Sequence, residues 1–233
     1  MKKRVILGDI HGHYDTFLKI YTKESPEDII LLGDYLDSIS KSSAECVECL
    51  KNILEAKKKH SSGKFIMLLG NHDLHYVLPG EKYSGYKIDT QIAVYNILID
   101  NILNGNITII YIDNINKILF SHAGISTVWL QDNNIKNLED INNITNTLDL
   151  NPLRFTGYNM YGDDVTNGPV WIRPHSLLKA MPEGWFQIVG HTQTGKPLEY
   201  PNLLVVDTLP NYYIVQELED NGELVRTNIV QLN

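Results

Sequence analysis

Five short segments of this 233-residue chain carry most of its candidate chemistry. Each follows an apolar run and presents aspartate, asparagine or histidine, in four of the five cases directly behind a glycine. The segments are Gly8–Gly12 (GDIHG), Gly33–Asp37 (GDYLD), Gly70–Asp73 (GNHD), Ser121–Gly124 (SHAG) and Gly190–His191 (GH). Carboxylate, amide and imidazole groups without thiolates favour Mn²⁺, Fe or Zn²⁺ as the bound metal over Ca²⁺ or Mg²⁺.

Asp9 and His11 indicate how such ligands converge. Side chains at alternate positions of an extended segment point the same way, so these two are expected to reach one metal ion. Together the segments supply six ligands, which are Asp9, His11, Asp34, Asn71, His122 and His191. Because one ion takes about three or four ligands from protein, six favour two ions that share a carboxylate. Such ions lie about 3.5–4 Å apart and clamp the attacking and leaving oxygens of a displacement at phosphorus.

The apolar runs that precede these segments predict the strands that position them. They are Val5–Leu7, Ile29–Leu32, Phe65–Leu69, Ile118–Phe120 and Phe186–Val189. Helices are predicted between the first three, over residues 13–23 and over a segment that ends at Lys57–Lys59. A β-α-β-α-β order predicts a parallel sheet with right-handed crossovers, whose ligand crevice lies at the carboxyl ends of the strands. The candidate ligands fall at those ends.

The second half of the chain reads as a second layer. A helix is predicted over 88–103, with Ile88, Ile92, Tyr95, Ile99 and Leu103 on its apolar face. Residues 107–112 and 117–120 predict a hairpin, 131–151 a surface helix region and 152–184 a loop-rich rim. Strands over 187–189, 203–206, 212–216 and 224–231 are expected to close a second, mostly antiparallel sheet. The chain is therefore expected to form one α/β domain over residues 1–233, a sandwich of two sheets flanked by helices.

Composition narrows the function. A net charge of −8 argues against non-specific binding to nucleic acid or to anionic membranes, which needs a basic face. No stretch approaches the roughly 20 apolar residues of a membrane span, and the first apolar run is too short for a signal peptide. A cytoplasmic protein is therefore expected. Cys46 and Cys49 form a C-x-x-C pair, but they belong to the apolar stripe of a helix and are expected to be buried core thiols.

The five segments, in this order and at this approximate spacing, resemble those of the calcineurin-like metallophosphoesterases. The likeness extends from about residue 5 to residue 207 and is greatest to the phosphoprotein-phosphatase branch, which includes bacterial and phage serine/threonine phosphatases and symmetrical diadenosine tetraphosphate hydrolases. The resemblance implies a four-layer fold, two divalent metal ions with Mn²⁺ favoured and Fe or Zn²⁺ as alternatives, and a phosphorylated substrate.

The resemblance also implies roles for individual residues. Asp9, His11 and Asp34 would bind the first metal, and Asp34 would bridge to a second held by Asn71, His122 and His191. A metal-bridging hydroxide would attack phosphorus. His72 would be the general acid, held and kept protonated by Asp37, because on an extended strand end it points away from Asn71. Arg173, in the Val170–Pro174 segment, would clamp the phosphate with Asn71.

One departure bears on the substrate. Ser38-Ile39 stands where the branch has Arg-Gly, and losing that phosphate contact costs roughly 1.5–3 kcal/mol of binding unless Lys41 compensates. Smaller departures are Asp73 for glutamate, and Leu209-Pro210 after a matching Asp207-Thr208. The leading prediction is hydrolysis of phosphomonoesters, including phosphoserine and phosphothreonine in proteins. A diadenosine tetraphosphate-type hydrolase or a phosphodiesterase is the alternative, and a catalytically weak scaffold for phosphorylated partners is a third hypothesis. Five aromatic residues either stack on a nucleobase or pack the rim, namely Tyr158, Tyr161, Trp171, Trp185 and Phe186.

Overall fold

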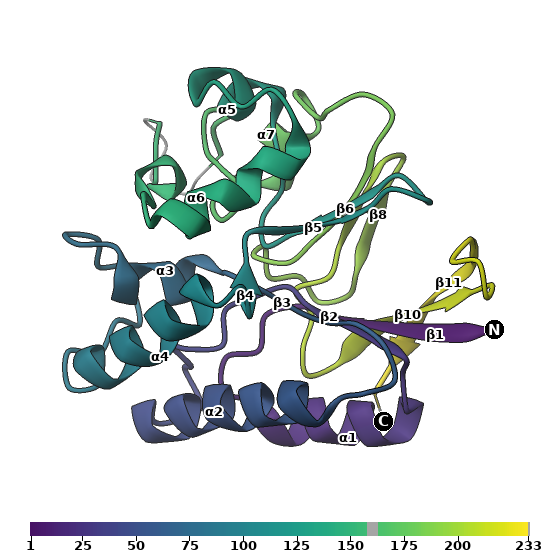
Figure 1. Cartoon of the computed structure of the whole chain (residues 1–233), viewed down its shortest axis with the longest axis horizontal. Coiled ribbons are helices and arrows are strands. Elements are labelled where there is room, and N and C mark those ends of the chain that lie inside the picture. The colour runs from purple at the N-terminus through teal and green to yellow at the C-terminus, as the bar shows by residue number, and fades with distance from the viewer. Residues whose placement is uncertain (158–162, 233) are drawn as a thin grey trace.

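The first of two sheets is built mainly from the amino-terminal half of the chain (Figure 1). The computed structural model describes residues 1–157 and 163–232. Six strands lie in the order β11-β10-β1-β2-β3-β4. Their bounds are β1 Lys2–Leu7, β2 Asp28–Leu31, β3 Phe65–Leu68, β4 Ile107–Thr108, β10 Tyr212–Leu218 and β11 Leu224–Gln231. Strands β1 to β3 are parallel, as predicted, and β4 joins them as a further parallel strand, so the carboxyl ends of all four lie on the same side of the sheet.

The second sheet has five strands in the order β5-β6-β7-β9-β8. Their bounds are β5 Ile110–Asp113, β6 Ile118–Ser121, β7 Phe186–Val189, β8 Leu198–Tyr200 and β9 Leu203–Val205. The predicted hairpin is confirmed for residues 110–113 and 118–121 as the antiparallel pair β5–β6, whereas residues 107–108, predicted as part of it, form β4 of the first sheet. Strands β6, β7 and β9 are parallel, so this sheet is mixed. His122 and His191 follow the carboxyl ends of β6 and β7, near the carboxyl ends of the parallel strands of the first sheet.

The carboxyl-terminal hairpin corrects one sequence prediction. Strands β10 and β11 extend the first sheet and not the second, because β10 pairs antiparallel with β1. In that register Ile214 lies opposite Ile6 and Val215 lies opposite Val5. All four side chains are buried, so β10 continues the apolar alternation of β1 on both faces. Hairpin signals in the sequence carry no information about which sheet a hairpin joins.

Helices cover both outer faces of the sandwich (Figure 1). Their bounds are α1 Tyr14–Glu24, α2 Ser43–Lys59, α3 Asn71–Val77, α4 Gln91–Leu103, α5 Thr127–Asp132, α6 Asn143–Thr147 and α7 Pro174–Leu177, with 3-10 turns at Leu138–Asn142 and Asn151–Leu153. A capping box between Ser42 and Glu45 starts α2, and three lysines complement the dipole of its last turn. No helix among residues 1–157 and 163–232 is long and apolar enough to cross a membrane.

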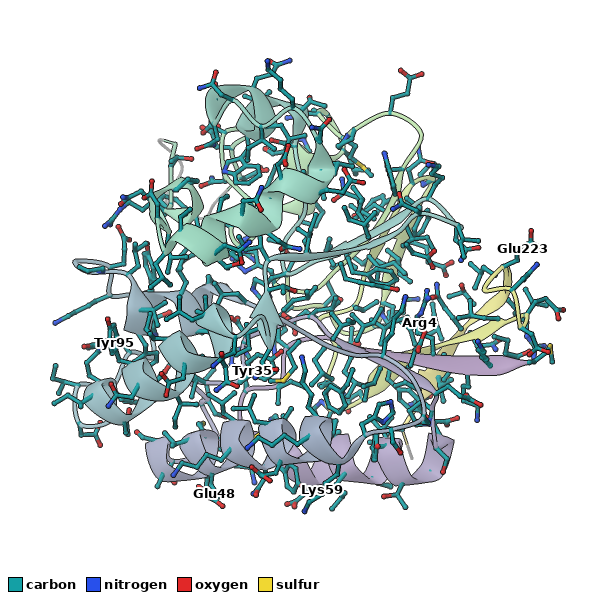
Figure 2. All side chains as sticks on the ribbon, viewed as in Figure 1. Arg4, Tyr35, Glu48, Lys59, Tyr95 and Glu223 are labelled. Atoms are coloured by element: carbon teal, nitrogen blue, oxygen red, sulfur yellow. The ribbon has the colours of Figure 1, made fainter. Side chains whose placement is uncertain are left out.

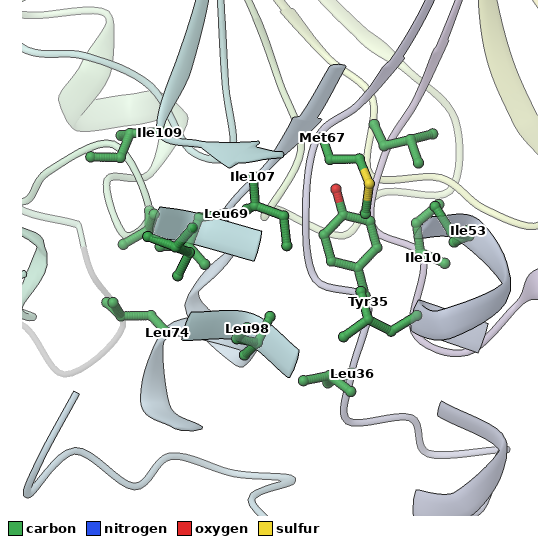
Figure 3. Packing of buried hydrophobic residues seen from close by; sticks show 14 of the residues in the cluster. Ile10, Tyr35, Leu36, Ile53, Met67, Leu69, Leu74, Leu98, Ile107 and Ile109 are labelled. Carbon is green, nitrogen blue, oxygen red and sulfur yellow. The ribbon is translucent and has the colours of Figure 1, made fainter. Parts of the chain in front are cut away.

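Apolar side chains alternate between the layers. Val5 and Leu7 pack toward α1 and α2, in the cluster whose centre Figure 3 shows around Tyr35 and Met67. Ile6, between Val5 and Leu7 in sequence, packs with Phe120 of β6 in the space between the two sheets. A third cluster, which includes Val205 and Leu177, covers the outer face of the second sheet. The predicted α/β sandwich of two sheets flanked by helices is confirmed. Cys46 and Cys49 are free and buried in the first cluster, as predicted.

The predicted apolar face of α4 is wrong. Ile88 and Ile92 are 70% and 78% exposed, and Tyr95 points outward at the left of Figure 2. The buried stripe is instead Val94, Leu98 and Ile102. The segment carries two apolar stripes with helical spacing, so its periodicity alone does not select one; packing against α3 and β4 does.

A buried ion pair joins the two sheets away from the site. Arg4 of β1 is 4% exposed and lies between the sheets in Figure 2. Its Nη1 donates to Asp113 Oδ2 of β5 at 2.8 Å and to Gln216 Oε1 of β10 at 3.2 Å. Hydrogen bonds from Asn116 and the Arg4 charge outweigh the effect of burial and lower the pKa of Asp113.

Candidate metal centre

The structure brings together the six residues predicted as ligands. Asp9 and His11 lie in the turn after β1 and Asp34 lies in the turn after β2. His11 Nε2 is 3.9 Å from Asp9 Oδ2 and 3.8 Å from Asp34 Oδ2. These three residues form a group whose ligand atoms all lie within 4.8 Å of one another, close enough for one metal ion.

A second set of ligands shares Asp34 with the first. Asn71 begins α3, and His122 and His191 follow β6 and β7. His122 Nε2 lies 3.5 Å from Asp34 Oδ2 and 2.9 Å from Asn71 Oδ1. His191 Nδ1 also lies 2.9 Å from Asn71 Oδ1. Asp34 is therefore the carboxylate that stands between the two sets.

Hydrogen bonds fix the tautomers of the three histidines. His11 Nδ1 donates to the carbonyl of Leu36, His122 Nδ1 to that of Leu32 and His191 Nε2 to that of Trp171. Because a carbonyl only accepts, each of these ring nitrogens carries the proton and the other nitrogen presents a lone pair. Those lone pairs face aspartate or asparagine oxygens, an arrangement that suits a cation bound between them. A backbone carbonyl behind a ligating histidine is the usual support of a metal site. The donor set thus fits two divalent cations.

The electrostatics of the site support the same reading. Asp9, Asp34 and Asp207 are all at most 7% exposed. Burial, reinforced by Asp207 and Asp34, raises the pKa of Asp9 well above its usual range, and burial raises the pKa of Asp207 to about 6. Burial also lowers the pKa of His122 and of His191, which favours neutral, ligating imidazoles. Asp207 was not among the predicted ligands, although the Asp207-Thr208 pair was its sequence signal.

The backbone that delivers these side chains differs from the extended segments that the sequence predicted. His11, Asp34, Asp37 and His191 have positive φ values of 41°, 50°, 55° and 62°. Non-glycine residues seldom adopt this left-handed conformation, and it clusters at functional sites. Asp9 and His11 therefore meet because the chain turns sharply at His11, and the alternation argument for their convergence was wrong.

Close approach explains two of the glycines that precede the ligands. A Cβ atom on Gly70 would lie 2.1 Å from Asp34 Oδ1, and one on Gly190 would lie 2.3 Å from Asp9 Oδ1. Each glycine therefore leaves room for the carboxylate of another segment. The glycine–ligand pairs in the sequence reflect this packing as well as a turn.

His72 lies on the first turn of α3, which corrects its predicted place on an extended strand end. Its amide donates to Asp34 Oδ1 at 2.8 Å, and its Nδ1 lies 3.1 Å from Asp37 Oδ2. Burial disfavours the charged ring, but Asp34 and Asp37 outweigh burial and raise the pKa of His72 to about 9. Burial likewise opposes ionisation of Asp37, but hydrogen bonds from His72, His75 and Tyr76 prevail and lower its pKa to about 2. His72 is thus held as a protonated partner of Asp37.

A cleft of about 810 Å³ opens onto these groups. Arg173 lines it, and its Nη1 donates to the carbonyl of His191 at 2.8 Å and to Thr192 Oγ1 at 3.2 Å. Ser38 also lines the cleft, whereas Lys41 is not among its described lining residues and lies 3.9 Å from Glu45. Compensation by Lys41 for the arginine that Ser38 replaces therefore stays a prediction.

The five aromatic residues considered for base stacking have different positions. Trp171 lines the cleft and packs edge-on against His191, with ring centroids 5.8 Å apart. Trp185 lies under the ammonium group of Lys117, and Phe186 packs between the sheets. Tyr158 and Tyr161 lie outside the described residues. Among the described aromatic residues considered for base stacking, only Trp171 reaches the cleft.

Comparison with known families agrees with this site. The profile of the calcineurin-like phosphoesterase family matches residues 2–213. The chain belongs to the calcineurin-like phosphoesterases. It is accordingly a metal-dependent phosphoesterase, and the predicted family and enzyme class are confirmed. None of the curated proteins compared with the chain matches it.

Solved structures share the fold. A cold-active protein tyrosine phosphatase is 21% identical, with 100% of this chain and 79% of that chain covered and a TM-score of 0.66. A protein serine/threonine phosphatase from Saccharomyces cerevisiae with similarity to human phosphatase PP5 is 14% identical, with 99% and 79% covered and a TM-score of 0.59. A putative diadenosine tetraphosphatase is 14% identical, with 99% and 93% covered and a TM-score of 0.51. At these identities the likeness establishes the fold alone.

Proposed function

We propose that this phosphoesterase hydrolyses phosphomonoesters, including phosphoserine and phosphothreonine in proteins. The observation that carries the proposal is the arrangement of two ligand sets that share Asp34, beside a protonated His72 paired with Asp37. A dinuclear centre and a general acid on one wall of a cleft are the parts that ester hydrolysis at phosphorus requires.

Asp9, His11 and Asp34 would hold one divalent cation, and Asp34, Asn71, His122 and His191 the other. The bound cations would lower the pKa of water to supply the nucleophile at neutral pH and would neutralise phosphate charge. We propose Mn²⁺ as the native metal, with Fe or Zn²⁺ as alternatives, because the donors are carboxylate, amide and imidazole.

His72 would protonate the leaving oxygen. Its Nδ1 faces Asp37, so its Nε2 proton is the one available to substrate. The Asp37 carboxylate keeps the ring charged and correctly turned, which matters most when the leaving group is a poor one such as a serine alkoxide. Arg173, anchored to His191 and Thr192, would bind phosphoryl oxygens together with the Asn71 amide.

The charges of the cleft favour a monoester. Arg173 is the one lysine or arginine among the described residues that line it, alongside Asp9, Asp34, Asp37 and Asp207. The two cations and Arg173 would engage one phosphoryl group, and the described lining offers no further lysine or arginine for the additional phosphates of a dinucleoside polyphosphate. The acidic lining likewise disfavours nucleic acid, which needs a basic channel. The His72–Asp37 pair disfavours a mere phosphate-binding scaffold, since binding needs no general acid.

The test is steady-state hydrolysis with added Mn²⁺. Substrates are phosphoserine, phosphothreonine and phosphotyrosine peptides, p-nitrophenyl phosphate, its bis-ester and diadenosine tetraphosphate. His72→Ala is the inactivating variant, and His175→Ala, with a side chain 72% exposed, is the matched histidine control. The proposal expects the phosphoserine or phosphothreonine peptide to have the highest kcat/KM and His72→Ala alone to lose about 10²–10⁴-fold in rate. Preference for the dinucleotide or the bis-ester would refute it, as would turnover that survives His72→Ala. A leading phosphotyrosine peptide would keep the monoester class and refute the serine/threonine assignment.

A further inference from the structure

Asp37 is contacted by His75 and Tyr76 as well as by His72. Tyr76 Oη donates to Asp37 Oδ1 at 2.7 Å, while His75 Nε2 lies 2.6 Å from Asp37 Oδ2, the same oxygen that faces His72. His75 and Tyr76 both come from α3, at three and four residues beyond His72. The side chains of His75 and Asp37 are 0% and 1% exposed, so water does not compete for these contacts.

The proton on His75 can be placed from its backbone contact. The amide of Tyr83 donates to His75 Nδ1 at 3.3 Å, so that nitrogen is an acceptor. The proton of a neutral His75 is therefore on Nε2, which lies 2.6 Å from Asp37 Oδ2 without the alignment of a regular hydrogen bond. Asp37, His72 and His75 have ligand atoms within 4.8 Å of one another and could in principle hold a cation. The direction of the Tyr83 contact distinguishes His75 from His11, His122 and His191, which donate to carbonyls and keep the inner lone pair for a metal.

The rings around His75 fix its orientation. It stacks on Tyr83 at 5.9 Å with an interplanar angle of 13° and packs edge-on against Tyr76 at 4.6 Å. Tyr76 is held in turn, because the amide of Lys87 donates to its hydroxyl at 3.1 Å. Asp37 itself sits at a φ of 55°, a strained conformation that its neighbours must maintain. The segment between α3 and α4 thus supports Asp37 through Tyr83 and His75 and through Lys87 and Tyr76.

We propose that His75 is a positioning residue of the phosphoesterase reaction. His75 places its Nε2 against Asp37 Oδ2, positions that carboxylate against His72 Nδ1 and so keeps His72 Nε2 aimed at the leaving oxygen. The proposal rests on the proposed function, because it gives His75 a part in protonating the leaving group. If His75 only filled the core, its substitution would lower the hydrolysis rate of every substrate alike. If it acts through His72, its substitution lowers the rate most for substrates whose leaving oxygen needs a proton.

The leaving group provides the test. Phosphoserine peptide needs protonation of its leaving oxygen, whereas 2,4-dinitrophenyl phosphate does not. His75→Leu removes the polar contact, and His75→Gln retains an N–H of similar reach. With Mn²⁺ we expect His75→Leu to lose about 10–100-fold in kcat on the peptide and less than about 3-fold on the dinitrophenyl ester, with His75→Gln within about 5-fold of wild type on both. Equal losses on the two substrates would overturn the proposal. If His75→Leu does not fold, His75→Asn, a polar amide too short to reach Asp37, takes its place with the same expectation.

Two further readouts separate His75 from a structural role and from a failure of the proposed function. In a His72→Ala background, His75→Leu should cause no additional loss, since the residue through which it acts is gone; a further loss would overturn the proposal. In metal-free wild type, ¹⁵N NMR of the imidazoles should show His75 as the neutral Nε2–H tautomer; the Nδ1–H tautomer would contradict it. If wild type with Mn²⁺ hydrolysed neither substrate, the proposed function itself would fall, and the proposal for His75 with it. Wild-type turnover with equal losses refutes the proposal alone.

Discussion

The variant Gly70→Ala tests why a glycine precedes a metal ligand. The glycine is needed either because the chain passes close to another segment or because its backbone is strained. Gly70 has a φ of −101°, which alanine adopts without strain, so only the added Cβ matters. That atom would lie 2.1 Å from Asp34 Oδ1 and 2.4 Å from the Asp34 amide, both under the 3.0 Å that real Cβ contacts observe. The carboxylate oxygen must therefore retreat by about 1 Å, several times the tolerance of about 0.2 Å for a metal ligand. Because Asp34 stands between both ligand sets, both cations should be affected.

We expect Gly70→Ala to lose about 10–100-fold in Mn²⁺ affinity, measured by isothermal titration calorimetry of chelator-treated protein. Gly195→Ala is the matched control, because a Cβ there meets nothing within 4 Å and its backbone is not in the left-handed region. Circular dichroism should show both variants folded. Gly190→Ala, whose Cβ would lie 2.3 Å from Asp9 Oδ1, should behave like Gly70→Ala. Mn²⁺ affinity of Gly70→Ala within about threefold of Gly195→Ala would refute the reasoning.

Three further predictions concern stability and thiol chemistry. Asp113→Ala removes the nearer carboxylate of buried Arg4, whose Nη2 still lies 3.7 Å from Asp28 Oδ2, and should lower the free energy of unfolding in urea by about 1–3 kcal/mol. The double variant Arg4→Met/Asp113→Leu should recover part of this loss, and a double variant no better than Asp113→Ala would contradict the reasoning. The hydroxyl of Tyr213 donates to Glu24 at 2.6 Å. Burial raises the pKa of Glu24, but this hydrogen bond and Lys3 outweigh burial and lower it. The hydrogen bond therefore stabilises the fold at pH values above the ordinary carboxyl pKa, and this stabilisation is lost as pH falls through the lowered pKa. Tyr213→Phe should therefore lower Tm at pH 7 and by less at pH 3, and equal losses at both pH values would exclude the linkage. Burial raises the pKa of the Cys49 thiol to about 12, so Ellman's reagent should label it only after denaturation, and rapid labelling of native protein would show that the thiol is accessible.

Much of the fold and of the candidate site could be predicted because each rests on a local pattern. Buried parallel strands require continuous apolar runs such as Ile29–Leu32, and a ligand crevice follows from where those runs end. The sequence could not show which of two possible surfaces or sheets a segment packs against. α4 carries two apolar stripes and the sequence does not say which is buried, and the β10–β11 hairpin does not say which sheet it joins. These choices depend on packing between segments far apart in the chain.

His75 and Asp207 were missed for a related reason. His75 has no glycine and no strand before it, and its relevance comes from the distance of 2.6 Å between its Nε2 and Asp37, more than thirty residues earlier. Asp207 follows β9 and reaches Asp9 from the opposite end of the chain. The convergence of Asp9 and His11 was predicted for the wrong reason, since a left-handed turn at His11 replaces the expected extended segment. Residues in strained conformations are the ones for which local propensity gives the wrong geometry.

The five sequence segments also depend on one another through their backbones. The amide of His191 donates to the Asp9 carboxylate, that of His72 donates to the Asp34 carboxylate, and those of Gly70 and Tyr35 donate to Asp73. Each of these carboxylates, buried at 4% exposure or less, therefore accepts an amide from a different segment, in addition to any metal it would bind. Such bonds offset part of the cost of burying the charge and hold the strained turns in place. A single glycine–ligand pair therefore says little by itself, whereas the ordered set specifies a site, because three of the five segments supply amide donors to the carboxylates of other segments.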